Sequence, residues 1–351
     1  MPGDTSKSRQ EHYIVISQGD VAGVAYPLLL QVLKHSHKYF TTTEVAKLKN
    51  IILIGDLFEK DEKILRQLFL LEEIPPNSQA ILHLMEKRKT KKPLFLFSQK
   101  ARSYESGKPS TGLALRAYHN FQQSLKIASA LPAASLLTLP LSKEYIQKAG
   151  IAFWGHTEVL ANYSKEKVFM CLYHPQLSVI PLTNHIPLAK VPKKILETDF
   201  VALAHALFFF RQFTKTKKKF GLTGLNPHAG EGGKLGDEEG FLSQGIQELS
   251  RHGVSVEGPL SADGAFSLES RKAYSLLITC YHDQGLAPFK ALFGLRGINI
   301  TLNLPFLRVS PDHGTAYQLA KEGKGNPLGV VTSLRFAIHR GALWKKVYSS
   351  L

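Results

Sequence analysis

The sequence predicts an α/β protein with mostly parallel sheets, divided between two domains. Apolar runs of strand length recur along the chain, and segments with helical periodicity separate them. At 351 residues the chain is also long for one compact core, so two domains are expected. A hydrophobic content of 44% is ordinary for a globular protein and excludes disorder over most of the length.

The predicted strands are short apolar runs bounded by turn residues or by helical segments. They cover residues 13–17, 51–55, 135–140, 168–173, 177–182, 220–225 and 275–280. Helical periodicity is expected at 28–40, 60–73, 109–130, 141–150 and 200–210, and the third of these helices begins after a cap at Ser110 or Thr111. The helix at 200–210 is apolar but far shorter than a bilayer span, so we expect a buried helix and no membrane contact.

The formal net charge of +16 favours acidic partners, either nucleic acid or phosphorylated metabolites. The basic cluster at 87–92 (KRKTKK) lies in a connection without interleaved aromatic residues, so we expect a solvated loop and no nucleic-acid binding. Only two cysteines occur, with no C-x-x-C pair, and the first twelve residues lack the apolar segment of a signal peptide. These features predict a cytoplasmic protein without disulfides.

Polar side chains follow directly after the apolar run at 275–280. His282 and Asp283 stand at its end, where ligands bind in open α/β sheets. Downstream, Lys290, Asn299 and Arg308 add two cations and an amide, a set suited to an anionic substrate. The alternative interpretation is an ordinary strand-to-loop turn with a hydrogen-bonded histidine.

Three of the 14 histidines share one position in the pattern. His185, His228 and His282 lie at or just past the ends of predicted strands, each beside an asparagine or aspartate. Three neutral imidazoles from separate strand ends would form a metal site with an open coordination position. Such a metal can polarise an oxygen and stabilise an alkoxide or enolate. The wide spacing favours a catalytic site over a structural one.

Two turns each have a functional and a plain interpretation. His156 and Thr157 follow Gly155 at the start of a helical segment, where they either contact substrate or, in the case of Thr157, cap the helix. Gly19 and Gly23 lie between the first strand and the next helix. That layout suits phosphate binding at a helix N-terminus, but it also occurs in ordinary connections.

Several long segments closely resemble signature segments of the 4-hydroxythreonine-4-phosphate dehydrogenase family. They are GLNPHAGEGGKLGDEE (224–239), CYHDQGLAPFK (280–290) and GINITLNLPFLRVSPDHGTA (297–316). The resemblance implies two α/β/α domains of the isopropylmalate/isocitrate dehydrogenase type, with the active site in the interdomain cleft of a homodimer. We expect the first domain to comprise residues 1–140 and 310–351, and the second residues 141–309.

The resemblance also implies a reaction. Family members use NAD to oxidise the 3-hydroxyl of 4-phosphohydroxy-L-threonine, and the product loses carbon dioxide. The resulting 3-amino-2-oxopropyl phosphate is used to build pyridoxal 5'-phosphate, vitamin B6. A small phosphorylated substrate and a divalent metal, which is zinc, magnesium or cobalt, are therefore expected. Two alternatives stay open: a paralogous dehydrogenase acting on another phosphorylated hydroxy acid or a dihydrodiol, and a degenerate homologue that binds metal and ligand without catalysis.

By the same resemblance the candidate site residues fall into groups. The metal ligands would be His185, His228 and His282, one of them supplied by the partner subunit. The substrate would contact His156, Thr157, Lys290, Asn299 and Arg308, and we assign catalytic or orienting roles to Lys290, Asp283 and Asp263. The cofactor loop would be residues 312–327, with His313, Gly314, Thr315, Ala316 and Gln318 beside the nucleotide.

The chain departs from the family in this cofactor loop. The family's loop is close to GTAFDIAGKG, whereas this sequence has Gln318 in place of the aspartate and Lys321 in place of the second glycine. An acidic residue near the adenosine ribose favours NAD over NADP, so the choice between NAD and NADP stays open. The turn at 19–27 also has Val21 where the family has proline, and its role is not fixed by the sequence.

Overall fold

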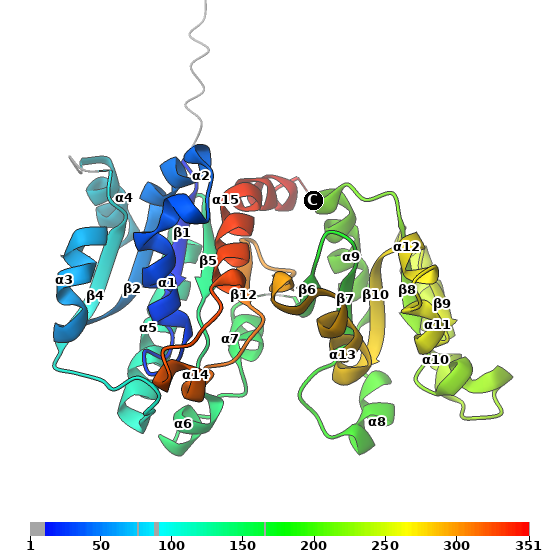
Figure 1. Cartoon of the computed structure of the whole chain (residues 1–351). Helices are drawn as coiled ribbons and strands as arrows, with labels where there is room; N and C mark the ends of the chain where they lie inside the picture. Colours follow the sequence, from blue (N-terminus) through cyan, green and yellow to red (C-terminus); the bar gives the residue numbers. More distant parts are fainter. Residues whose placement is uncertain (1–10, 76, 88–90, 165, 351) are drawn as a thin grey trace, which may run out of the picture.

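The computed structural model describes residues 11–75, 77–87, 91–164 and 166–350, which are organised around one twelve-stranded sheet (Figure 1). The strands follow the order β3-β4-β2-β1-β5-β12-β11-β6-β7-β10-β8-β9. The middle of the basic cluster at 87–92, predicted to be a solvated loop, lies outside the described residues. The strands are β1 Tyr13–Ser17, β2 Ile51–Phe58, β3 Leu70–Glu73, β4 Leu94–Ala101, β5 Ala134–Thr138, β6 Phe169–Tyr173, β7 Ser178–Thr183, β8 Lys219–Thr223, β9 Glu257–Leu260, β10 Tyr274–Tyr281, β11 Ile298–Leu302 and β12 Arg308–Pro311.

Helices cover the sheet, and none in the described part of the chain is both long and apolar enough to span a membrane. The α-helices are α1 Ala25–Lys34, α2 Thr42–Lys47, α3 Glu59–Leu68, α4 Ser78–Lys87, α5 Thr111–Ala130, α6 Lys143–Lys148, α7 His156–Tyr163, α8 Val191–Ile195, α9 Phe200–Thr214, α10 Glu238–Arg251, α11 Ala262–Ala265, α12 Ser270–Ala273, α13 His282–Phe293, α14 Tyr317–Lys321 and α15 Leu328–Tyr348. Short 3₁₀ turns are η1 Ser36–Lys38, η2 Leu48–Asn50, η3 Leu188–Lys190, η4 Pro227–Gly232 and η5 Gly294–Arg296.

The strand pairing confirms the predicted fold class. Strands β3, β4, β2, β1, β5 and β12 pair in parallel, and so do β7, β10, β8 and β9. The antiparallel pairs lie at the centre of the sheet, where β11 pairs with β12 and β6, and β6 pairs with β7. Strands β1, β2 and β10 are buried along nearly their whole length, as expected of parallel strands that are covered on both faces. The division into two domains stays a prediction.

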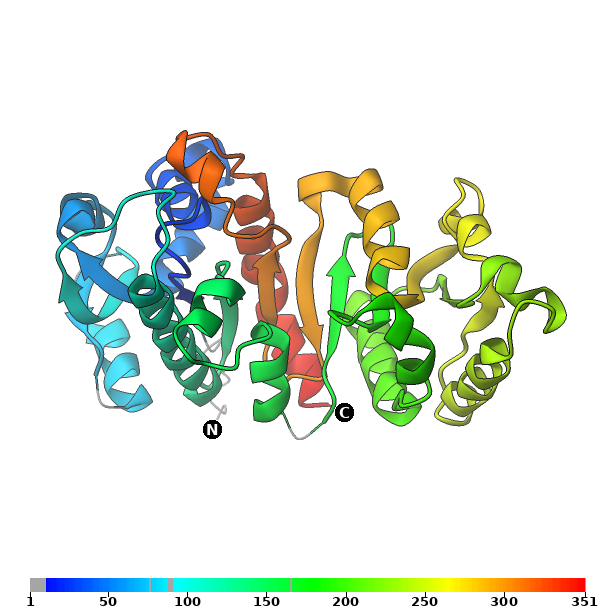
Figure 2. The same ribbon diagram turned by 90° about the horizontal axis from the view of Figure 1, so that it is seen from below.

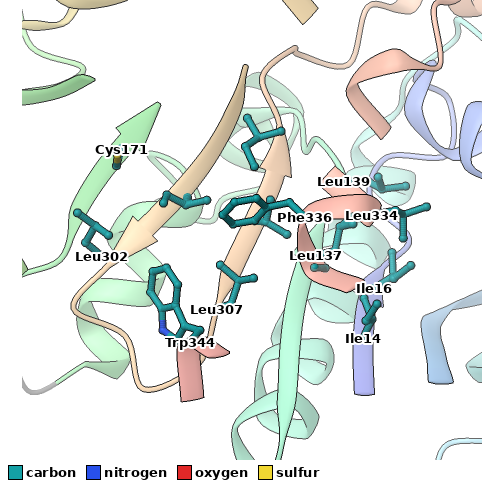
Figure 3. Close-up of a cluster of buried hydrophobic side chains, with 14 of the residues drawn as sticks. Ile14, Ile16, Leu137, Leu139, Cys171, Leu302, Leu307, Leu334, Phe336 and Trp344 are labelled. Carbon is teal, nitrogen blue, oxygen red and sulfur yellow. The ribbon is translucent and has the colours of Figure 1, made fainter. Parts of the chain in front are cut away.

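The C-terminal helix α15 joins the two halves of the sheet. In Figure 2 it lies in red between the blue-to-teal first half and the green-to-yellow second half. Its residues Leu334, Phe336 and Trp344 belong to one buried cluster with residues of β1, β5 and β11 (Figure 3). The Trp344 indole packs on Phe209 of α9, with ring centroids 4.5 Å apart, and Nε1 donates to the Leu304 carbonyl at 3.0 Å. This packing fixes the elements on either side of the central strands.

Two helical predictions extended too far, and in the first, at 28–40, helix α1 already stops at Lys34. The helical pattern at 60–73 ends early, because α3 stops at Leu68 and residues Leu70–Glu73 form strand β3. That strand pairs in parallel with β4, a partner that lies more than twenty residues further along the chain and that local periodicity cannot reveal. The cap before α5 is confirmed at Ser110, whose hydroxyl accepts from the Leu113 amide at 3.2 Å.

Replacing the buried indole that joins the two halves should destabilise the protein. We expect Trp344→Ala to lower the free energy of unfolding by about 3–5 kcal/mol, because Trp344 is 0% exposed and the substitution leaves a cavity. Trp154→Ala, at a tryptophan that is 64% exposed, should change it by no more than about 0.5 kcal/mol. Chemical denaturation followed by circular dichroism measures both, and equal effects would contradict the packing described here.

Candidate active site

A pocket of about 290 Å³ lies over the central strands, between helices α7 and α13. Its volume is near the lower end of the range for small-ligand sites. The pocket brings together residues that are far apart in the sequence and that were predicted from it: His156, Thr157, His185, His282, Lys290, Asn299, Arg308, His313 and Gly314. Eight of the nine carry side-chain polar atoms, so the pocket suits a small polar ligand.

Arg308, the first residue of β12, places a buried cation at the pocket. It is 3% exposed, and its guanidinium donates to the hydroxyl of Thr138 at 2.7 and 3.2 Å and to that of Thr301 at 3.4 Å. Within the described part of the chain no acidic side chain forms an ion pair with it. Burial lowers the pKa of Arg308 to about 10, so the side chain still carries its charge at neutral pH. A buried cation without a counterion is a site for an anionic ligand.

Lys290 and Asp312 form the ion pair of this pocket. Lys290 lies on α13, and its Nζ is 3.4 Å from Oδ2 of Asp312, which follows β12 directly. Burial raises the pKa of Asp312, and the positive charge of Lys290 opposes that rise. The half-exposed ammonium is therefore held beside a largely buried carboxylate, where it can contact a ligand and exchange a proton with it.

The N-terminus of α7 contributes His156 and Thr157. Gly155 occupies the N-cap position with a φ of 151°, so the interpretation of Thr157 as the helix cap was wrong. No side chain caps this helix, and its first amide groups are free to bind an anion. The His156 ring packs edge-on against Phe121 and Phe153. Burial, together with the charges of Arg308 and Lys143, lowers the pKa of His156 well below its usual value, so the imidazole is neutral.

His185 and His282 lie side by side because the strands before them are neighbours. β7 and β10 pair in parallel with Thr183 opposite Tyr281, and the two imidazole centroids are 5.5 Å apart. Asp283 accepts from His282 Nδ1 at 2.6 Å, which leaves His282 Nε2 free to coordinate. Burial lowers the pKa of His185 and favours its neutral form. Asp283 therefore contacts His282, although its side chain is mostly exposed, and its orienting role stays a prediction.

His228 and Asp263 do not reach this pair. Among the described residues no group of three histidine, cysteine or acidic side chains is placed to hold a metal ion. His228 lies in turn η4 with a φ of 51°, exposed to solvent, and its charge acts on nearby Asp263. Asp263 accepts hydrogen bonds from Ser261 Oγ and from the Gly264 amide, which lower its pKa. One chain thus supplies two of the three predicted metal ligands at the pocket.

The predicted cofactor loop rests on the turn at 19–27. The Val24 amide donates to the Thr315 carbonyl at 2.8 Å, and a Cβ at Gly23 would lie 2.8 Å from that same oxygen. Asp20, which is buried, accepts from the Tyr317 hydroxyl at 2.5 Å. Despite its altered sequence, this turn therefore supports the loop, in which Ala316 adopts a left-handed conformation at the start of α14.

Gln318 and Lys321, the two unusual residues of the loop, have different surroundings. Gln318 donates from Nε2 to Glu322 Oε1 at 2.5 Å. A carboxylate therefore stands one helical turn after the position of the missing aspartate. Lys321 is exposed and lies against Gly107, where an added Cβ would be 2.5 Å from Lys321 Cβ. The loop thus offers both a carboxylate and a cation to a nucleotide.

The sequence reasoning missed four polar residues of the pocket. Thr138 ends β5, Ser310 lies in β12, Asp312 begins the cofactor loop, and Lys143 begins α6 with its Nζ 3.2 Å from His185 Nδ1. Burial lowers the pKa of Lys143. Thr138 and Asp312 both stand at strand ends, which is the feature that singled out His282. Lys143 gives no such indication, because a lysine in the first turn of a helix is ordinary.

Three buried polar atoms at the pocket have no hydrogen-bond partner within the described residues. They are His156 Nε2, Asn299 Oδ1 and His313 Nε2, and a fourth such atom, Asp312 Oδ2, has only its ion pair with Lys290. Unsatisfied buried groups are rare in folded proteins, and here they surround one space. The imidazoles of His185 and His282 supply the nitrogen donors that zinc and cobalt prefer. The residues present therefore fit both a polar ligand and a divalent metal.

The chain is similar to known proteins over most of its length. The family model described as "Pyridoxal phosphate biosynthetic protein PdxA" matches residues 49–337. A 4-hydroxythreonine-4-phosphate dehydrogenase from Sulfurihydrogenibium sp. (strain YO3AOP1) is 31% identical over 331 residues, covering 93% of this chain and 97% of that protein. Another from Ruegeria sp. (strain TM1040) is 41% identical over 224 residues, covering 62% of this chain and 68% of that protein.

A solved structure shares the fold at similar coverage. The crystal structure of a 4-hydroxythreonine-4-phosphate dehydrogenase from Klebsiella pneumoniae matches with a TM-score of 0.69 and 27% sequence identity, covering 93% of this chain and 99% of that one. The family match covers well over half of the chain, and it includes every candidate site residue except those of the turn at 19–27. The chain therefore belongs to the PdxA family of pyridoxal phosphate biosynthetic proteins.

Proposed function

We propose that the chain is a 4-hydroxythreonine-4-phosphate dehydrogenase that acts in pyridoxal 5'-phosphate synthesis. It oxidises 4-phosphohydroxy-L-threonine at the 3-hydroxyl with a nicotinamide dinucleotide, and decarboxylation then yields 3-amino-2-oxopropyl phosphate. The observation that supports this most is Arg308, a buried guanidinium without an acidic partner in the described chain. The two cysteines are free and buried, in keeping with the cytoplasmic location expected from the sequence.

The anionic groups of the substrate match the cations of the pocket. Arg308 offers a planar donor set that can bind a phosphate or carboxylate with two hydrogen bonds. Lys290 and Lys143 add charge, and the uncapped N-terminus of α7 adds amide groups. The neutral His156 and the amide of Asn299, each with an unpaired buried atom, would hold the hydroxyl and amino groups of the substrate.

Two proton movements accompany the proposed reaction. During oxidation, carbon 3 transfers a hydride to the nicotinamide, and a base accepts the proton of the 3-hydroxyl. After the carboxylate departs as carbon dioxide, the remaining carbon must gain a proton. Lys290, held beside Asp312, lies in the pocket in a position to exchange these protons, and we assign it that role. The lowered pKa of Lys143 makes it a second candidate for the base.

A divalent metal would be held by His185 and His282, with His228 of a second copy as the third ligand. When bound, such a metal stabilises the negative oxygen that forms during oxidation and decarboxylation. A second pocket of about 290 Å³ shares the same two imidazoles and is lined by both polar and apolar side chains, the latter including Ile186, Leu188 and Val191. These apolar side chains could contact the exposed Leu235 of a second copy, which follows the turn that carries His228. We therefore propose a homodimer with its active site at the subunit interface.

The proposed cofactor is NAD or NADP, bound at residues His313 to Gln318. His313 and Gly314 line the pocket, which places the start of the loop beside the substrate. Lys321 has no ion-pair partner within the described residues, and a 2'-phosphate would supply one. We therefore propose that NADP is accepted alongside NAD.

Replacing Arg308 with a neutral residue should lower activity without lowering stability. We expect Arg308→Gln to lower kcat/KM for 4-phosphohydroxy-L-threonine by roughly 30-fold or more, since losing one partner of a buried charge pair costs about 2–5 kcal/mol. The unfolding temperature without ligand should stay the same or rise, because the substitution removes a buried charge that has no acidic partner. Arg296→Gln, at an exposed arginine of η5, is the matched control. Unchanged kcat/KM in Arg308→Gln would contradict the proposed role.

Metal removal should abolish formation of the reduced nucleotide. A chelator is expected to stop the reaction and added Zn²⁺ or Co²⁺ to restore it, because two imidazole donors stand at the pocket. His282→Ala should weaken Co²⁺ binding by more than the roughly 100-fold that loss of an outer-shell partner can cost. His174→Ala is the control, since His174 stacks on Phe293 and does not line the pocket. Chelator-insensitive turnover would overturn the metal assignment.

Nucleotide preference should respond to Lys321. We expect turnover with both NAD and NADP, and we expect Lys321→Ala to lower kcat/KM for NADP by up to roughly fivefold, the effect of an exposed charge pair worth at most about 1 kcal/mol. The value for NAD should stay unchanged, because NAD lacks the 2'-phosphate. Lys272→Ala, at an exposed lysine that lies outside the loop and is already paired with Glu269, serves as control. An equal effect on both nucleotides would sink this assignment.

A further inference from the structure

The segment 228–233 is a left-handed turn of six consecutive residues. Its φ angles are 51° at His228, 53° at Ala229, 78° at Gly230 and 44° at Glu231, followed by two glycines at 68° and 92°. L-residues avoid this region because the side chain crowds the following carbonyl. Three of the six residues are not glycine, so surrounding contacts must hold the turn in place. The turn lies between β8 and α10 (Figure 1).

Backbone hydrogen bonds of the turn, such as that from Gly233 to the Gly230 carbonyl, are supplemented by side-chain contacts from Glu239, in the first turn of α10. Its side chain is 8% exposed. Oε1 accepts from the Asn226 backbone amide at 2.8 Å, and Oε2 accepts from Asn226 Nδ2 at 3.1 Å. The turn also closes against the same carboxylate, because a Cβ at Gly230 would lie 2.7 Å from Oε2. The carboxylate thus contacts the turn both before and after His228.

A second side chain ties the base of the turn to the pocket. Gln284 of α13 donates from Nε2 to the Gly224 carbonyl at 2.8 Å. Its Oε1 accepts from the Cys280 amide at 2.7 Å and from the Thr223 hydroxyl at 2.9 Å. Gln284 stands two residues after His282, so the end of β8 is fixed relative to the helix that begins at His282. The remaining freedom of the turn lies beyond Gly224, where Glu239 acts.

His228 itself makes no hydrogen bond within the described part of the chain, and its side chain is exposed. Its direction therefore depends on the backbone of the turn. The neighbouring Glu238 accepts from Asn226 Nδ2 at 2.9 Å, lies against Gly236, and is less buried than Glu239. The two adjacent glutamates differ in that Glu239 alone of the two accepts from a backbone amide, that of Asn226 just before the turn.

We propose that Glu239 is the positioning residue that holds His228 in the direction needed to ligate the metal of a second copy. This inference rests on the proposed function, in which His228 completes the site formed by His185 and His282. Because Glu239 touches neither substrate nor metal, it acts entirely through His228. Its loss should therefore weaken metal binding by the roughly 10–100-fold typical of outer-shell partners, and only while His228 is present.

The test is a double-mutant cycle on Co²⁺ affinity, measured with the full-length metal-free protein from the visible absorption of bound cobalt. The variants are Glu239→Ala, His228→Ala and both together, with Glu238→Ala as the matched control. We expect each single variant at 239 and 228 to weaken binding, and the double variant to bind no more weakly than His228→Ala alone. Glu239→Gln, which keeps one acceptor oxygen, should recover part of the affinity and covers the case in which Glu239→Ala fails to fold.

The possible results distinguish a failure of the Glu239 role from a failure of the proposed metal site. If His228→Ala weakens Co²⁺ binding but Glu239→Ala and Glu239→Gln do not, the positioning role is wrong and the metal site stands. Additive losses in the double variant would also overturn the inference, since Glu239 would then act by another route. If His228→Ala leaves Co²⁺ affinity unchanged, both the proposed third ligand and the role of Glu239 are refuted. Weakening by Glu238→Ala equal to that of Glu239→Ala would refute the specific assignment to Glu239.

Discussion

The buried guanidinium of Arg308 is the constraint on which the rest of the site depends. Holding a cation away from water without a counterion costs on the order of several kcal/mol, and Thr138 and Thr301 satisfy only its hydrogen bonds. No neighbouring group neutralises this positive charge, because the nearby His156 is neutral and Asp312 forms its ion pair with Lys290. An anionic ligand would therefore form an ion pair with the buried Arg308 guanidinium. Its binding would offset the desolvation cost of burying that charge without a counterion.

The fold supplies that pocket by joining distant parts of the chain. The central antiparallel strands β12, β11 and β6 connect two parallel halves, and α15 packs across them through Trp344. The residues proposed to bind substrate come from the central strands and from α7 and α13, whereas the proposed nucleotide loop contacts the turn at 19–27. His228 does not line the pocket. One chain thus supplies all the residues proposed to bind the anion but only two of the three proposed metal ligands, which is the physical reason for proposing a dimer.

Much of this arrangement could be predicted from the sequence, for identifiable reasons. Strands β1, β6, β7 and β10 were predicted because both of their faces are buried, so they are continuous apolar runs. Strand β3 was missed because its only signal is the pairing with β4. At the site, strand-end polarity and the family resemblance found Arg308, Lys290 and the histidine pair. Neither signal could show that Arg308 lacks an acidic partner or that Lys143 contacts His185, since those facts depend on packing. Nor could they show that His228 lies in a left-handed turn, away from His185 and His282.

The most direct test of the account compares 4-phosphohydroxy-L-threonine with 4-hydroxy-L-threonine, which lacks only the phosphate. The measurement is the rate of reduced-nucleotide formation with metal-loaded protein, in parallel with NAD and NADP. If the pocket's cations bind phosphate, kcat/KM should favour the phosphorylated substrate by at least roughly 30-fold, since an unpaired buried charge costs about 2 kcal/mol or more. Similar kcat/KM values for the two compounds, or no turnover of either with a folded, metal-loaded protein, would contradict the central claim.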